Sequence, residues 1–311
     1  MPIGRYRLSD SERQTLEAEL ADRYADFLDT VHASGAPFAC IAVDGLDPLA
    51  DLGRHLEQAV FDEEAGSEPM DIVYAEYENR SIFFLGVDAA RRSVSGCLRV
   101  VTGTARMGPM VKTLNDVLSR ASYTDLGVPH DASEIDLRDR IEIEPERTTG
   151  RLGNHWGGNE LRLDRTFVES FHAMEPGEPI FDMATVVIPR SVRQTDAKRL
   201  SLLIYSGSWR GARLLNAKHA VTFIRDDLLT EFRETLGMGW EDLGGLGKTQ
   251  YVEGDPYLSQ PAYAHLDAFH HMLEREYYNR LIGREPKLGP PFESFVQLMQ
   301  SPACDDLFLL G

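Results

Sequence analysis

Residues 180–200 read IFDMATVVIPRSVRQTDAKRL, and this stretch decides the fold that the sequence predicts. The apolar run 180–188 indicates a β-strand, which the following proline ends. A long helix is expected over 196–215, where leucine and isoleucine recur at helical spacing. A short basic turn lies between them and contains Arg190, Arg193 and Gln194. Because basic side chains beside the N–H groups of a helix N-terminus suit a pyrophosphate, this turn is the first candidate binding site.

Strand and helix patterns alternate along the rest of the chain. Further helices are expected over 9–32, 48–61, 111–118, 228–236, 268–281 and 292–299. Further strands are expected over 37–43, 81–87, 94–101, 220–224 and 260–266. Residues 63–70 are interpreted as a loop, and the charged stretch 122–177 as an insertion with a short helix at 163–172. This alternation predicts an α/β fold with a mixed central sheet and flanking helices.

The composition limits the classes of partner. Of 311 residues, 50 are acidic and 32 are Lys or Arg, which gives a formal net charge of −18. Nucleic acids and anionic membranes attract basic surfaces, so we expect neither as a partner. Cys40, Cys97 and Cys304 are widely spaced, which is typical of thiols in a reducing compartment. The sequence has no leader pattern and no apolar run that would cross a membrane, so a cytoplasmic protein is expected.

The basic turn and the elements around it resemble the GNAT acyltransferases. In that family a motif of roughly V-x-P-x-x-R-G-x-G/A holds the diphosphate of coenzyme A, and Val187, Pro189 and Arg193 stand near its positions. The stretch FRETLGMGWEDLGG at 232–245 resembles the helix and turn that precede the last strands of the family. The stretch FFLGVDAARRSVSGCLRVV at 83–101 resembles its second and third strands.

This resemblance spans about residues 55–120 and 178–266 and implies a GNAT-like core. Three segments are predicted from it. Residues 1–62 form an N-terminal helical elaboration with the first GNAT-like helix, 63–266 form the acyltransferase core with its insertion at 122–177, and 267–311 form a C-terminal helical extension. The resemblance implies acyl-CoA or acyl-phosphopantetheine as donor, an amine as acceptor and no metal.

A narrower resemblance concerns LEQAVFDEE at 56–64, EYE at 76–78 and GCLRVV at 96–101. These stretches are similar to the acyl-homoserine-lactone synthases and N-acyl amino acid synthases, which are GNAT-fold enzymes that take acyl chains from acyl carrier protein. In that branch the arginine of the G-x-x-R strand helps to shape the substrate site, which implies this role for Arg99. The acidic surface of this chain disfavours an acidic carrier protein, but a local basic patch can overcome that repulsion, so coenzyme A and carrier protein both remain as donors.

Acyl transfer to an amine requires a base, stabilisation of an oxyanion and a leaving thiolate. Asp182 is the one acidic residue in the strand 180–188 and is the predicted general base, although a carboxylate bonded to backbone is an equal interpretation. The backbone N–H groups of Val186, Val187 and Ile188 are expected to bind the pantetheine or the thioester carbonyl. The family resemblance also implies a tyrosine acid. The candidates are Tyr251, Tyr257 and Tyr263, of which Tyr263 is our prediction.

Three alternatives stay open. The cluster His155, Trp156 and Asn159 in the glycine-rich stretch 153–160 is interpreted as a surface loop or as a lid, with Trp156 as a substrate contact. Asp267, His271 and Glu274 share one helix face at a spacing that suits a metal ion in a metal-dependent enzyme, but a solvated surface is favoured because charged residues on a helix are mostly exposed. The basic turn has no glycine, which is also compatible with a catalytically degenerate GNAT fold that only binds an acyl ligand or a partner.

Overall fold

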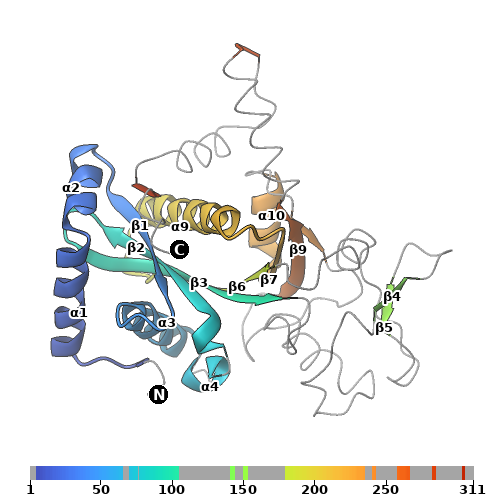
Figure 1. The fold of residues 1–311 in the computed structure, drawn as a ribbon, viewed down its shortest axis with the longest axis horizontal. Coiled ribbons are helices and arrows are strands. Elements are labelled where there is room, and N and C mark those ends of the chain that lie inside the picture. The colour runs from blue at the N-terminus through green and yellow to red at the C-terminus, as the bar shows by residue number, and fades with distance from the viewer. Residues whose placement is uncertain are drawn as a thin grey trace. The chain divides into compact units, whose positions relative to one another are not determined.

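The structure is a computed structural model of the chain (Figure 1). It describes residues 5–65, 70–75, 77–104, 141–143, 150–152, 179–234, 240–242, 258–266, 282–284 and 303–304. The chain divides into two compact units. The first comprises Met1–Val101, Thr185–Leu214 and Pro290–Gly311, and the second comprises Thr102–Ala184 and Leu215–Gly289. The three segments inferred from the sequence, with limits at 62 and 266, stay a prediction.

Two consecutive helices, α1 (Asp10–Arg23) and α2 (Ala25–Ala33), form the N-terminal part of the first unit. Ser9 caps α1 because its hydroxyl accepts a hydrogen bond from the N–H of Glu12, and the Glu12 carboxylate accepts one from the N–H of Ser9. This reciprocal capping box satisfies two N–H groups that have no partner within the helix.

The sequence predicted one continuous helix over 9–32, and the structure corrects this at Tyr24. The backbone there adopts φ −113° and ψ 22°, outside the helical range. Leu20 and Leu28, on either side of the break, are fully buried. Each helix therefore directs its own apolar face into the core.

Three antiparallel strands form the sheet of the first unit: β1 (Phe38–Asp44), β2 (Ser81–Asp88) and β3 (Ser93–Thr104). The turn between β2 and β3 includes Arg92, whose φ of 55° is left-handed. The strands predicted over 37–43, 81–87 and 94–101 are confirmed.

Helix α3 (Ala50–Ala65), helix α4 (Met70–Tyr74) and the 3₁₀ turn η1 (Glu78–Arg80) connect β1 to β2. The helix predicted over 48–61 is confirmed. The loop predicted over 63–70 is wrong at both ends, because α3 continues to Ala65 and α4 begins at Met70.

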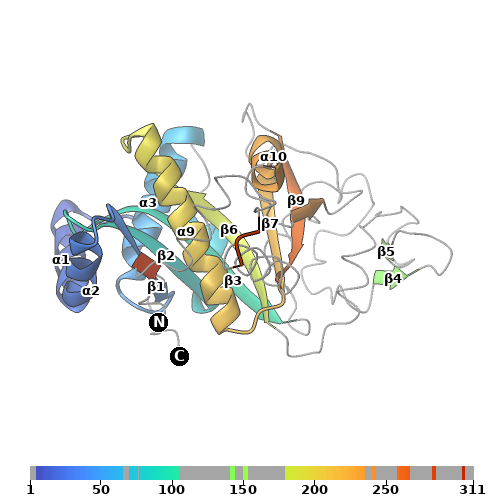
Figure 2. The same cartoon turned by 90° about the horizontal axis from the view of Figure 1, so that it is seen from above.

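Helix α9 (Gln194–Leu214) and helix α3 cover opposite faces of this sheet (Figures 1 and 2). Along β2 the side chains alternate between the two faces, as in any strand. Phe83 lies against Gly53 of α3, whereas the backbone of Gly86 lies against Leu200 of α9. The helix predicted over 196–215 is thus confirmed, and the sheet is covered by a helix on each face.

Three glycines allow α9 to approach the sheet closely. Gly86 and Gly96 are opposite one another on β2 and β3, and a Cβ atom on them would lie 2.4 Å and 3.0 Å from Leu200. On the helix, a Cβ atom on Gly207 would lie 2.4 Å from the Sγ of Cys40 on β1. We call these three residues the glycine contact, because only glycine leaves room for this packing.

The second unit contains a mixed sheet. Strand β6 (Pro179–Val187) pairs through residues 180–183 in parallel with β7 (His219–Arg225). Strand β7 pairs antiparallel with β9 (Ser259–His265), which pairs antiparallel with β8 (Trp240–Asp242). The residues of β6 after Ala184 belong to the first unit.

Most sequence predictions for this unit are confirmed. They are the strands over 180–188, 220–224 and 260–266 and the helix over 228–236, which is α10 (Asp226–Glu234). Strand β8 was missed, since three residues before a glycine-rich stretch carry no strand pattern. The charged insertion contains a short antiparallel pair that was also missed, β4 (Ile141–Ile143) and β5 (Gly150–Leu152).

The predicted fold class, a mixed α/β sheet with flanking helices, is confirmed. The order of β2, β3, β6, α9, β7, α10 and the last two strands is the order that the GNAT resemblance implies. The helices predicted over 111–118, 163–172, 268–281 and 292–299 lie outside the described residues. Among the helices that are described, none combines the length and the apolar character that crossing a membrane requires.

We predict that Gly207→Ala lowers the free energy of unfolding. Overpacking against Cys40 costs about 1–3 kcal/mol and the better helix propensity of alanine returns about 1 kcal/mol, for a net loss of up to about 2 kcal/mol. Urea unfolding followed by circular dichroism measures this loss. Adding Cys40→Ala removes the Sγ atom, so the double variant should lose less than the two single losses combined; simple additivity would contradict the close contact.

Candidate functional site

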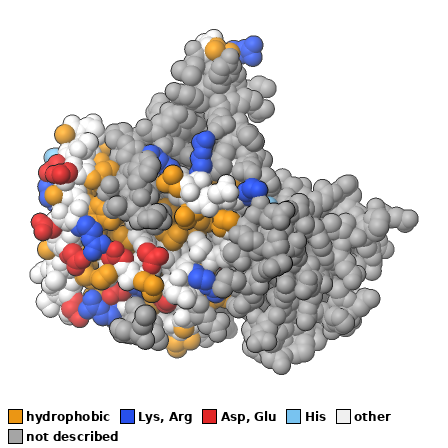
Figure 3. Space-filling model, viewed as in Figure 1, with side chains coloured by type: hydrophobic (Ala, Val, Ile, Leu, Met, Phe, Trp, Pro, Cys, Tyr) orange, Lys and Arg blue, Asp and Glu red, His pale blue; other side chains and the backbone are white. Residues whose placement is uncertain are grey.

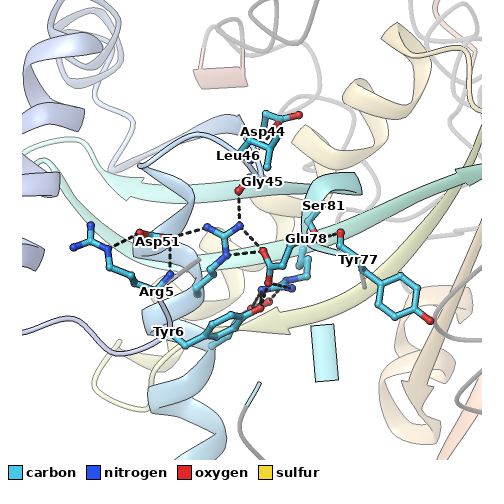
Figure 4. A network of polar contacts seen from close by, with 12 residues as sticks. Arg5, Tyr6, Asp44, Gly45, Leu46, Asp51, Tyr77, Glu78 and Ser81 are labelled. Atoms are coloured by element: carbon cyan, nitrogen blue, oxygen red, sulfur yellow. Dashed lines mark hydrogen bonds and ion pairs between the residues drawn. The ribbon is translucent and has the colours of Figure 1, made fainter. Parts of the chain in front are cut away.

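A group of charged side chains is buried between α3 and the sheet of the first unit (Figure 4). We call it the buried charge network. Its members are Tyr6, Asp51, Arg54, Glu57, Glu78, Arg99 and Thr185. Helix α3 supplies three of them at a spacing of three residues, which places them on one side of the helix. Charged side chains are rarely buried unless they are paired, so each member needs an identified partner.

Arg99 of β3 lies at the centre of the network and has no exposed surface. Its Nε and Nη2 atoms donate to the two carboxylate oxygens of Glu57 at 3.2 and 2.7 Å. Nη2 also donates to the Tyr6 hydroxyl at 2.7 Å, and Nη1 donates to Glu78 at 3.4 Å. The guanidinium carbon lies 3.9 Å from the centre of the Tyr74 ring, close enough for a cation–π contact. Protein groups thus occupy every guanidinium nitrogen of Arg99.

Arg54 forms the second centre and is 2% exposed. It donates to Glu78 through Nε at 2.8 Å, to Asp51 through Nη1 at 2.7 Å, and to the carbonyl of Gly45. Asp51 also accepts from Nε of Arg5 at 3.0 Å. The two guanidinium groups of the network, together with that of the exposed Arg5, thus pair with its three carboxylates, which balances the charge.

The N-terminal segment 5–8 lies along α3 and closes one side of the network. The Tyr6 hydroxyl donates to Glu78 while it accepts from Arg99 (Figure 4). Burial raises the pKa of this phenol, so it stays protonated and can donate. The N–H of Leu8 donates to Nδ1 of His55 at 3.2 Å, which fastens the segment to the helix.

Glu57 links the network to β6. Its Oε1 atom accepts a hydrogen bond from the hydroxyl of Thr185, in addition to the bond from Arg99. Burial raises the pKa of the Glu57 carboxyl, and the adjacent guanidinium of Arg99 opposes that rise. The sequence analysis missed Glu57 and Thr185. The available signal was Arg99 itself, since an arginine inside an apolar strand requires a buried carboxylate.

The basic turn lies between β6 and α9, as predicted. Val187 is buried and Val186 and Ile188 are half-buried, whereas Arg190, Arg193 and Gln194 are exposed. The N–H of Val192 donates to the carbonyl of Pro189 at 3.0 Å, and the N–H of Ala197 donates to the carbonyl of Arg193 at 2.8 Å.

Two further cations follow in the first turns of α9, the exposed Lys198 and Arg199. On the face seen in Figure 3, the acidic side chains of the described residues are interspersed with basic and apolar ones. A local concentration of cations at a helix N-terminus is therefore compatible with an acidic chain.

The predicted base and the predicted acid share one row of the second unit. The Cα atom of Asp182 is opposite that of Val221, which is opposite that of Tyr263 on β9. Two strand spacings, about 10 Å, separate their backbones. Asp182 is fully buried, which is compatible with either interpretation given from the sequence.

Other predicted residues lie outside the described part of the chain. They are Trp156 with His155 and Asn159, Tyr251, Tyr257, and the helix face of Asp267, His271 and Glu274. Within the described ranges, no three His, Cys, Asp or Glu side chains form a group that could hold a metal ion. The three cysteines Cys40, Cys97 and Cys304 are buried free thiols.

Comparison with known proteins gives similarities to solved structures only. No protein-family profile and no curated protein matches the chain. FeeM, an N-acyl amino acid synthase from uncultured soil microbes, has a TM-score of 0.42 and 8% identity, with 75% of this chain and 94% of that chain covered. TofI, solved with an inhibitor and MTA, has a TM-score of 0.41 and 11% identity over 81% of this chain and 100% of that chain.

MesI, a CoA-dependent acyl-homoserine lactone synthase, has a TM-score of 0.40 and 11% identity, with 84% of this chain and 95% of that chain covered. FeeM and MesI belong to the two enzyme groups that the sequence resembles. With TM-scores below 0.5, these similarities do not establish an activity for this chain.

We predict that Arg99→Met lowers the free energy of unfolding by about 3–5 kcal/mol, because it leaves buried carboxylates without their cation. Arg225→Met is the matched control. Arg225 pairs with Asp227 at 2.6 Å, but their side chains are 36% and 54% exposed, so the loss should be below about 1 kcal/mol. Urea unfolding of both variants measures the difference. Equal losses would contradict the central position of Arg99.

Proposed function

We propose that this chain is an acyltransferase that moves an acyl group from acyl-CoA or acyl carrier protein to an amine on a small-molecule acceptor. The observation that carries the proposal is the exposed basic turn between β6 and the N-terminus of α9. In the GNAT family, which the sequence resembles, a turn at this place in the element order holds the diphosphate of coenzyme A.

The chemistry of the turn supports this assignment. Free N–H groups and the positive end of the helix dipole favour an anion at a helix N-terminus. Arg190 and Arg193 add full charges, and Lys198 and Arg199 follow in the first turns. The glycine contact fixes α9 against the sheet, so the turn is held at one end by a packed helix. The backbone of Val186, Val187 and Ile188 would then bind the pantetheine arm or the thioester carbonyl.

In this proposal Asp182 acts as the general base on the acceptor amine, and Tyr263 acts as the acid for the leaving thiolate. A buried carboxylate can hold a raised pKa and accept a proton near neutral pH. The position of both residues in one row of the second unit supports their pairing. Arg99 and Trp156 stay predicted substrate-site residues, and a cytoplasmic location is part of the same proposal.

A second candidate function is binding without turnover. It is favoured by the stretch 190–199, RSVRQTDAKR, which has no glycine where the family motif has G-x-G/A. Larger side chains limit how closely a diphosphate can approach the backbone. This candidate predicts that the protein binds a thioester ligand and transfers no acyl group.

We predict that coenzyme A and acyl-CoAs raise the melting temperature of the protein and that Arg193→Ala reduces this rise. A ligand at about 100 times its Kd adds about 2.7 kcal/mol of stability to the folded state. Loss of one hydrogen bond to a charged phosphate should weaken binding by about tenfold. Arg213→Ala, at the opposite end of α9, is the control and should leave the shift unchanged. No shift with any thioester would reject coenzyme A as the donor and direct the assay to acyl carrier protein.

We also predict that Asp182→Asn lowers kcat at neutral pH by about 10²–10⁴-fold while it leaves donor binding intact. The amide keeps the size of the carboxylate but cannot accept a proton. A steady-state assay of thiol release, together with the thermal shift, separates the two effects. Unchanged turnover would remove Asp182 as the base, and binding without any turnover in the unmodified protein would favour the second candidate function.

A further inference from the structure

A hydrogen bond between side chains connects the buried charge network to β6. The hydroxyl of Thr185 donates to Oε1 of Glu57, and Glu57 is held on its other side by Arg99. Both partners of the contact are buried: Glu57 has no exposed surface and Thr185 is 6% exposed. Glu57, Arg99 and Thr185 all belong to the first unit, so the contact lies within one compact body.

Thr185 lies beyond the part of β6 that pairs with β7. The ladder between β6 and β7 ends at the pair Met183↔Thr222. Beyond it, Thr185 bonds to Glu57, and the carbonyl of Val187 lies near Gly96 of β3, 3.2 Å from the position of a Cβ atom there. The end of β6 is thus fastened by a different set of contacts from its beginning.

The contact also fixes Thr185 on the α3 side of the strand, and the side chains that follow alternate from there. Side chains alternate along a strand, so a shift by one residue would turn each of them to the opposite face. Thr185 faces α3, where Glu57 lies, whereas Ile188 approaches Gly96 on the α9 side. A hydroxyl held by a buried carboxylate resists such a shift more strongly than an apolar side chain, because the shift would leave the buried hydroxyl without its partner and the Glu57 carboxylate with one hydrogen bond fewer.

We propose that Thr185, held by Glu57 and through it by Arg99, is a positioning residue for the acyl donor. It fixes the backbone of Val186, Val187 and Ile188, which leads into the basic turn, so that their N–H groups meet the pantetheine arm in one register. This inference rests on the proposed acyl-transfer function and adds to it a role for a network that does not touch the donor. Thr185 acts on the donor only through the strand backbone.

The test compares Thr185→Val, which keeps the shape and removes the hydroxyl, with Thr185→Ser, which keeps the hydroxyl. Thr222→Val is the matched control. Thr222 is a buried threonine on β7, 7% exposed, whose hydroxyl donates to the carbonyl of Met183 on β6 at 2.8 Å. Thr222→Val therefore also removes one hydrogen bond of a buried threonine, but at the pair where the β6–β7 ladder ends and to a neutral carbonyl instead of a carboxylate.

The first readout is amide hydrogen exchange of residues 186–188, which requires no substrate. Thr185→Val should speed exchange at these amides by about tenfold, the change expected for one lost hydrogen bond to a charged group. Thr185→Ser and Thr222→Val should leave them within about twofold of the unmodified protein. Unchanged exchange in Thr185→Val, or an equal acceleration in Thr222→Val, would overturn the positioning role.

The second readout is the KM for acyl-CoA, measured beside kcat. Thr185→Val should raise KM by about fivefold or more with little change in kcat, and Thr185→Ser should restore it. An equal KM in Thr185→Val and the unmodified protein would overturn the link to the donor. If the unmodified protein binds and turns over no thioester, the proposed function fails, and the exchange experiment still decides whether Thr185 fixes the strand.

Discussion

The burial of one guanidinium group, that of Arg99, is the constraint from which much of the first unit follows. An arginine with no exposed surface has lost its hydration, and the attraction of carboxylates must offset that loss. Two carboxylates, a phenol and an aromatic ring surround it, and they come from α3, η1, the N-terminal segment and α4. Segments far apart in sequence are thereby held at one place, because each supplies a group that Arg99 requires.

The same constraint makes the two faces of this sheet different. The face toward α3 carries the buried charge network beside the apolar Phe83, and its fit depends on matched donors and acceptors. The face toward α9 is apolar and includes the glycine contact, so its fit depends on close approach. A long helix packed this closely has little freedom to slide, since Leu200 lies directly over Gly86 and Gly96. The basic turn leads directly into α9, so one end of the turn is held in place by this packing.

Local sequence patterns predicted where most helices and strands lie, whereas the break at Tyr24 and the partners of buried charges depend on contacts between distant residues. The apolar run 180–188 and the helix over 196–215 were readable because their periodicity lies within one segment. The break at Tyr24 could not be read from the sequence, since the burial of the Tyr24 side chain depends on partners elsewhere in the fold. Glu57 and Thr185 are 128 positions apart, so no spacing rule joins them. Along α3, Glu57 is fully buried while the adjacent apolar residue Leu56 is only half-buried, because Glu57 faces Arg99.

A guanidinium whose nitrogens are all occupied cannot contact a substrate unless it exchanges a partner. The partners of Arg99 differ in what that exchange would cost. Loss of Glu57 would leave a cation and an anion buried apart, and loss of Glu78 would also leave Arg54 short of a carboxylate. Tyr6 is the neutral partner, and it belongs to a segment held by a few hydrogen bonds along α3. If Arg99 contributes to a substrate site, as the family resemblance implies, exchange of the Tyr6 hydroxyl preserves the charge balance that the other two exchanges would destroy.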